Sequence, residues 1–142
     1  MKRLLTALIL FAILSFTELW ACEFSYTITD TQEKSVNVIP SQPVMLEIGE
    51  TYTFTISFYE DHRNCTVSPS DTLFLLDGGR WRVGREAQGL VLDTAIVWKE
   101  NSSRLNTGVG TFTALRPGSY TLEVIRECSR GGYTADLRFI VS

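Results

Sequence analysis

The sequence contains few of the residues from which metal clusters are built. It has one histidine and three cysteines, too few for a zinc cluster made of several Cys-x-x-Cys pairs. It has only four prolines and ten glycines in 142 residues, which excludes a collagen-like or disordered chain. The formal net charge is −3, and an acidic chain binds the phosphate backbone poorly, so no nucleic-acid partner is expected. A chain of this length, 44% hydrophobic, is expected to fold as one domain.

The one long apolar run lies near the N-terminus. Basic residues at positions 2 and 3 precede an apolar segment over 4–16, and Ala21 stands just before Cys22. A basic start, an apolar run of this length and a small residue at its end are typical of a secretory signal peptide. The run is shorter than the roughly 20 apolar residues of a membrane helix. We therefore expect residues 1–21 to be a signal peptide of an exported protein, with an uncleaved signal anchor as the alternative.

The segment Leu19-Trp20-Ala21-Cys22 resembles the lipobox of bacterial lipoproteins. In that motif a leucine and a small residue precede the cysteine that receives the lipid, while Trp20 stands where the motif has a small or β-branched residue. The resemblance implies lipidation of Cys22 and a periplasmic or outer-membrane location, with contact to the membrane only through the lipid. Plain secretion is the alternative. Cysteine parity favours the lipid, because it leaves Cys65 and Cys128 as an even pair.

Beyond residue 21 the chain has strand patterns and no helical period. The clearest is 51–58, where apolar and aromatic residues alternate with Thr and Ser, as in a half-buried strand. Further strands are expected at 24–28, 36–38, 44–48, 73–76, 81–83, 90–92, 95–98, 111–115, 120–124 and 133–141. Asp77-Gly78-Gly79 and Arg116-Pro117-Gly118 indicate turns, and the polar segments 59–72 and 100–110 indicate loops. This succession predicts an all-β antiparallel sandwich.

The segment 115–124 resembles the penultimate strand of bacterial immunoglobulin-like and fibronectin-like domains. It reads Leu115-Arg116-Pro117-Gly118-Ser119-Tyr120-Thr121-Leu122-Glu123-Val124. The resemblance implies an immunoglobulin-like sandwich over residues 44–142, preceded by an N-terminal strand and edge segment over 22–43. It also implies that Tyr120 bonds back to the backbone at this corner, the alternative being a tyrosine that is simply packed in the core.

Cys65 and Cys128 lie beyond the ends of two of these strands. Suppose that 51–58 is the second strand and 119–126 the sixth of an immunoglobulin-like order. The two strands then run in the same direction in opposite sheets, and both cysteines fall at one pole of the sandwich. We therefore expect a Cys65–Cys128 disulfide, worth about 4 kcal/mol in a chain-entropy account. A reactive or metal-binding thiol pair is the alternative.

The predicted disulfide brings together two polar loops, which form the candidate binding site. Loops at the end of a rigid sandwich commonly carry binding residues. The residues of this site are Asp61, His62, Arg63, Arg126, Glu127, Arg130, Gly131 and Gly132. Their mixed charge suits a protein or glycan partner in the cell envelope, and the loop 100–110 is expected at the same pole. The alternative is a pole that only stabilises the fold.

A metal or redox function is a further alternative for this pole. His62, Cys65 and Cys128 would supply one nitrogen and two sulfurs, soft ligands that suit copper or zinc. No fourth ligand is evident, and the main interpretation has no metal and no cofactor. No set of residues resembles a catalytic triad or a phosphate-binding loop, so we do not expect an enzyme.

A third alternative comes from the segment Thr107-Gly108-Val109-Gly110-Thr111-Phe112, followed by 115–118. It is similar to part of the chagasin-type inhibitors of papain-like cysteine proteases, which are immunoglobulin-like sandwiches that block a cleft with three loops at one pole. The resemblance implies that Gly108 and Gly110 belong to such a loop. The family's other two loop motifs are replaced here by 64–69 and 126–128.

Two tryptophans and a group of three arginines are also notable in the sequence. Trp81 and Trp98 are expected in or beside the core, with a glycan-stacking platform as the alternative. Arg80, Arg82 and Arg85 form a small basic strip, expected to be a solvated strand face, with an anion site as the alternative.

Overall fold

Ten strands and two short 3₁₀ helices make up the part of the chain that the computed structural model describes, residues 22–60, 67–102, 104–127 and 132–142. The strands are β1 (Cys22–Thr29), β2 (Ser35–Val38), β3 (Pro43–Leu46), β4 (Thr51–Glu60), β5 (Leu73–Leu76), β6 (Gly79–Arg80), β7 (Leu90–Glu100), β8 (Leu105–Ala114), β9 (Gly118–Arg126) and β10 (Tyr133–Val141), and the 3₁₀ helices are η1 (Pro69–Asp71) and η2 (Glu86–Gln88). No helix among these residues is long and apolar enough to cross a membrane. The predicted signal peptide, 1–21, lies outside the described residues.

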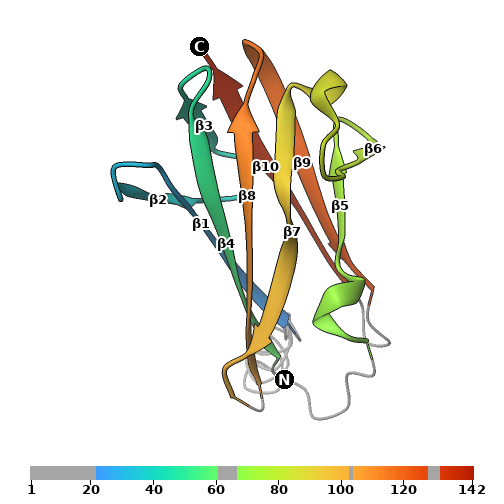
Figure 1. Cartoon of the computed structure of the whole chain (residues 1–142). Coiled ribbons are helices and arrows are strands. Elements are labelled where there is room, and N and C mark those ends of the chain that lie inside the picture. Colours follow the sequence, from blue (N-terminus) through green and yellow to red (C-terminus); the bar gives the residue numbers. More distant parts are fainter. Residues whose placement is uncertain (1–21, 61–66, 103, 128–131) are drawn as a thin grey trace, which may run out of the picture.

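The strands form two five-stranded sheets that face each other (Figure 1). The first has the order β2-β1-β4-β8-β7 and the second the order β3-β10-β9-β5-β6. The neighbours β1-β4-β8-β7 and β10-β9-β5 correspond to strands A-B-E-D and G-F-C of an immunoglobulin-like sandwich. The predicted all-β sandwich is confirmed. Strands β4 and β9 lie in opposite sheets, as expected, and run toward the same end of the molecule (Figure 1).

The N-terminal part departs from a purely antiparallel sandwich at one strand, β3. Residues 22–43 contribute β1 and β2 to the same sheet as β4, and β1 pairs with β4 along its whole length. Strand β3 then crosses to the other sheet and pairs parallel with β10, from Arg138↔Pro43 to Val141↔Leu46. Proline at the start of an edge strand leaves no ladder hydrogen bond unmade, which suits Pro43 to this position.

The predicted loop over 100–110 is wrong for most of its length. Strand β8 begins at Leu105 and pairs with β4 and β7 on both sides. Gly108 and Gly110 lie within it, facing inward. A Cβ on Gly108 would lie 3.0 Å from Ile96 and 3.1 Å from the Trp98 ring. The glycines therefore make room for two β7 side chains, whereas the chagasin resemblance implied that they belong to a loop.

The core follows the alternation predicted for β4. Its inward residues Tyr52, Phe54, Ile56 and Phe58 are buried. Trp81 is also buried, as expected, and its indole Nε1–H donates to the Leu90 carbonyl at 2.8 Å. Burial of an indole is favourable when its N–H finds an acceptor, so this bond fixes the segment after β6 against β7.

One end of the sandwich, here called the turn pole, consists of the short connections 47–50, 77–78, 86–89 and 115–117. Asp77 and Gly78 have φ values of 48° and 78°, as a tight hairpin turn requires. The Tyr120 hydroxyl donates to the Arg116 carbonyl at 2.9 Å, so the predicted bond at this corner is confirmed.

Candidate functional site

The opposite end, here called the loop pole, is where β4, β7 and β9 end and where β1, β8 and β10 begin (Figure 1). Cys22 pairs with Glu60 there, and the Glu60 amide donates to the Arg104 carbonyl at 2.8 Å. The short connection between β7 and β8 therefore lies at this pole, as predicted for the longer loop. Of the candidate site, the structure describes Arg126, Glu127 and Gly132. The predicted residues outside the described part are Asp61, His62, Arg63, Cys65, Cys128, Arg130 and Gly131.

Arg126 is buried, which corrects its prediction as a surface binding residue. Its exposed fraction is 1%, and it follows Leu122 and Val124 on the inward face of β9. Period-two alternation along this strand is the signal that could have revealed its position. A charged side chain is buried only when hydrogen-bond partners compensate its desolvation.

Those partners come from the connection between β4 and β5. The Arg126 guanidinium donates from Nη1 to the Ser68 carbonyl at 2.8 Å and from Nη2 to the Val67 carbonyl at 2.5 Å. Its Cζ lies 4.2 Å from the centroid of the Phe58 ring, within the range of a cation–π interaction. One side chain thus fastens the end of β4, residues 67–68 and the end of β9 together; we call this set the Arg126 clamp.

The segment that the clamp holds has a defined local structure. Ser68 is the N-cap of η1: its hydroxyl accepts from the Ser70 amide, and Asp71 accepts from the Ser68 amide at 3.2 Å. This reciprocal capping box satisfies backbone donors that a helix end otherwise leaves open. The chain therefore enters β5 through a fixed turn, and the Arg126 clamp acts on an ordered segment.

A layer of aromatic side chains lies inside the loop pole and spans both sheets. Phe24 of β1 stacks on Phe58 of β4 and on Tyr133 of β10, with ring centroids 4.7 and 4.3 Å apart. The Tyr26 hydroxyl donates to the Tyr133 hydroxyl at 3.0 Å. Burial raises the pKa of Tyr26 and also that of Tyr133, because a phenolate loses its hydration there. This aromatic layer was not predicted as part of the site, and it gives the loops a rigid base.

Two predicted site residues lie on the surface of this pole. Glu127 and Gly132 are both exposed. Gly132 has a φ of 55°, a left-handed backbone conformation that favours glycine. The thiols of the predicted disulfide lie outside the described residues, as does the predicted lipidation of Cys22, whose backbone alone is described.

The structure bears differently on the two alternative functions, a metal or redox site and a chagasin-type inhibitor. Within the described ranges no group of three His, Cys, Asp or Glu side chains is arranged to hold a metal, while His62, Cys65 and Cys128 lie outside those ranges. The loop implied by the chagasin resemblance is wrong, because Gly108 and Gly110 are in the middle of β8.

The comparisons with known proteins add no family. The chain matches no protein-family model, and no curated protein is significantly similar to it in sequence.

Proposed function

We propose that the protein is a non-catalytic binding or assembly module of the cell envelope, which contacts a protein or glycan partner through loops at the loop pole. The observation that carries the proposal is the Arg126 clamp. A buried guanidinium holds residues 67–68 beside the end of β9, next to both segments that contain the predicted site residues. Loops supported by a rigid scaffold are the usual carriers of binding residues on sandwich folds.

We further propose that Cys65 and Cys128 form a disulfide at this pole. Cys65 precedes Val67 by two residues and Cys128 follows Arg126 by two, and the Val67 carbonyl and the Arg126 guanidinium are hydrogen-bonded. Two residues of extended chain span at most about 7 Å, so the backbone of each cysteine lies within that distance of a residue that joins the two segments. The pairing requires an oxidising compartment, which agrees with the proposed export and signal peptide.

We also propose that Cys22 is lipidated, which has a consequence for orientation. Cys22 opens β1 and pairs with Glu60 at the loop pole, so a lipid there would hold this pole beside the membrane and direct the turn pole away from it. The partner of the loops is then to be sought among proteins or glycans close to the membrane surface.

The test uses the mature protein, immobilised and exposed to an envelope extract from its own source. The variant Asp61→Ala/His62→Ala/Arg130→Ala is expected to lose the bound partner while its unfolding free energy stays within about 1 kcal/mol of the wild type. The matched control Glu47→Ala/Glu86→Ala/Arg116→Ala removes exposed charges at the turn pole and is expected to keep the partner. Equal capture by both variants, or collapse of the first, would contradict the proposal.

A further inference from the structure

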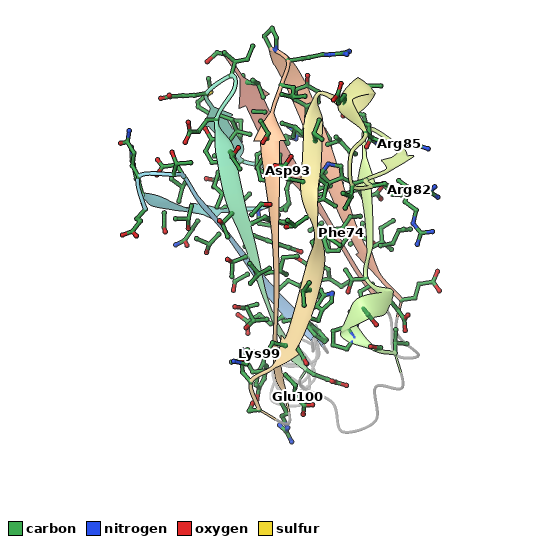
Figure 2. All side chains as sticks on the ribbon, in the orientation of Figure 1. Phe74, Arg82, Arg85, Asp93, Lys99 and Glu100 are labelled. Atoms are coloured by element: carbon green, nitrogen blue, oxygen red, sulfur yellow. The ribbon has the colours of Figure 1, made fainter. Side chains whose placement is uncertain are left out.

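A groove lies away from the loop pole, between the edge strands of the two sheets. Strand β7 is the edge of the first sheet, and the β5–β6 hairpin is the edge of the second. The groove between them has a volume of about 290 Å³. Its walls include apolar side chains from both sheets and two arginines: Phe74, Val83, Ala95, Ile96, Arg80 and Arg82. We call it the edge groove. Figure 2 shows Phe74 between β7 and β5, with Arg82 at the outer side of the hairpin.

The charged residues that line the edge groove are both arginines, Arg80 and Arg82. Arg80, Arg82 and Arg85 are exposed, and no carboxylate in the described part of the chain forms an ion pair with any of the three. No acidic residue lines the groove. In a chain whose formal net charge is −3, this is a local excess of unneutralised guanidinium groups beside apolar walls. Such a combination suits a ligand that carries carboxylates and apolar side chains together.

The backbone of β7 changes along this edge. Up to Leu92 it is covered, because the Gly84 amide donates to the Leu92 carbonyl at 3.0 Å and Val83 forms a bridge with Leu92. From Asp93 to Glu100, β7 pairs only with β8 within the described residues, and Val97 on this stretch is 70% exposed. An edge strand of this kind presents N–H and C=O groups to which a further strand can bond.

Two register shifts between Leu92 and Val97 limit what this edge can accept. Such bulges bend a strand and protect an edge against long, flat pairing. The geometry favours a short extended segment over a whole sheet, and the groove volume admits only a few side chains.

We propose that the edge groove binds a short extended peptide segment of a partner protein that carries acidic residues. The segment adds to the open edge of β7 as a strand. Its apolar side chains pack against Phe74 and Ile96, and its carboxylates meet Arg80 and Arg82. The open backbone edge favours a peptide over a fatty acid, which has similar charge and apolar character but no backbone amides. This site is separate from the loop pole and does not depend on the function proposed there.

Fluorescence anisotropy tests the proposal with a fluorescein-labelled octapeptide of alternating valine and glutamate, and with the same peptide carrying lysine in place of glutamate. Saturable binding is expected for the glutamate peptide, at least tenfold tighter than for the lysine peptide. Arg80→Glu/Arg82→Glu is expected to weaken binding of the glutamate peptide about tenfold, because it turns two exposed attractive charge pairs into repulsive ones. Arg116→Glu, an exposed arginine at the turn pole, serves as the matched control and should change it less than twofold. Hydrogen exchange should show new protection of amides within 94–98.

Several results would overturn the proposal: no saturable binding to the wild type, equal binding of the lysine peptide, or an affinity unchanged by Arg80→Glu/Arg82→Glu. Binding of dodecanoate without binding of the peptide would also overturn it, since the occupant would then be a lipid-like acid. If the double variant fails to fold, the test uses Arg82→Ala instead. This substitution alters an exposed side chain outside the strands. About a threefold loss is then expected, and an unchanged affinity would count against the site.

Discussion

Backbone hydrogen bonds join the connections of the turn pole to one another and to β8, whereas at the loop pole a buried side chain, Arg126, holds the connection between β4 and β5. The Gly49 amide donates to the Ala114 carbonyl at 2.6 Å, and the Leu115 amide donates to the Gly89 carbonyl at 2.7 Å. The loop pole depends instead on the buried Arg126 guanidinium and on stacked aromatic rings. Side chains buried beneath a loop fix its position and leave its exposed residues available for a partner. This contrast is why we propose the loop pole, and not the turn pole, as the binding surface.

The largest effect is expected from the proposed disulfide. Cys65→Ala/Cys128→Ala should lower the free energy of unfolding by about 4 kcal/mol, because the unfolded chain regains the entropy of an open loop. Urea unfolding measures this loss, and a reductant should lower the free energy of unfolding of the wild type by a similar amount. Cys22→Ala is the control and should leave the stability unchanged. A wild type indifferent to reductant would show that the loop pole is held without the bridge.

The Arg126 clamp comes next. Arg126→Ala should cost about 3 kcal/mol, because it leaves the Val67 and Ser68 carbonyls without their charged donor and opens a cavity beside Phe58. Arg126→Lys should cost less than Arg126→Ala, because an ammonium keeps the positive charge. It should still destabilise the protein, because an ammonium lacks the planar fork that reaches both carbonyls. Urea unfolding compares the two variants. A loss below 1 kcal/mol for Arg126→Ala would mean that the clamp does not hold this pole.

The turn pole offers a matched pair of glycines. Gly78 and Gly89 both have positive φ, at 78° and 80°. A Cβ on Gly78 would meet nothing within 4 Å, whereas one on Gly89 would lie 2.7 Å from Cζ of Tyr120. Gly78→Ala should therefore cost about 1 kcal/mol of backbone strain, and Gly89→Ala about 2 kcal/mol, since it also displaces the tyrosine of the corner. Thermal unfolding measures both losses of stability. Equal losses would show that contact with Tyr120 adds nothing to the cost of Gly89→Ala.

High pH should weaken the loop pole through its buried tyrosines. Burial raises the pKa of Tyr26 and Tyr133 above the ordinary value of 10.0. The unfolded chain releases these protons first, so their contribution is complete below pH 10 and is lost as the pH rises beyond it. About 1 kcal/mol is expected for Tyr26 between pH 10 and 11, and a smaller loss for the half-buried Tyr133. Tyr26→Phe/Tyr133→Phe should decline less steeply over this range, and an identical slope would contradict the expectation.

The sequence predicted the features that depend on local pattern. Alternation over 51–58 identified β4, the Asp-Gly step identified the β5–β6 turn, and the corner motif identified the Tyr120 bond. It failed where packing between strands decides. Gly108 and Gly110 looked like a loop because their role is to make room for side chains of a neighbouring strand.

The candidate site was predicted with less success than the fold. Arg126 was predicted as a site residue because its side chain is charged, although the period-two alternation along β9 places it on the inward face. The aromatic layer could not be assembled from the sequence, because Phe24, Phe58 and Tyr133 come from strands far apart along the chain. Only the fold brings their rings together.

Peptide mapping of the mature protein under non-reducing conditions tests whether a Cys65–Cys128 bridge holds the loop pole. Mass spectrometry after alkylation and proteolysis should find one cross-linked pair of peptides, joining Cys65 to Cys128. Recovery of both cysteines as alkylated free thiols, or a bridge from either of them to Cys22, would contradict the account of how the loop pole is held.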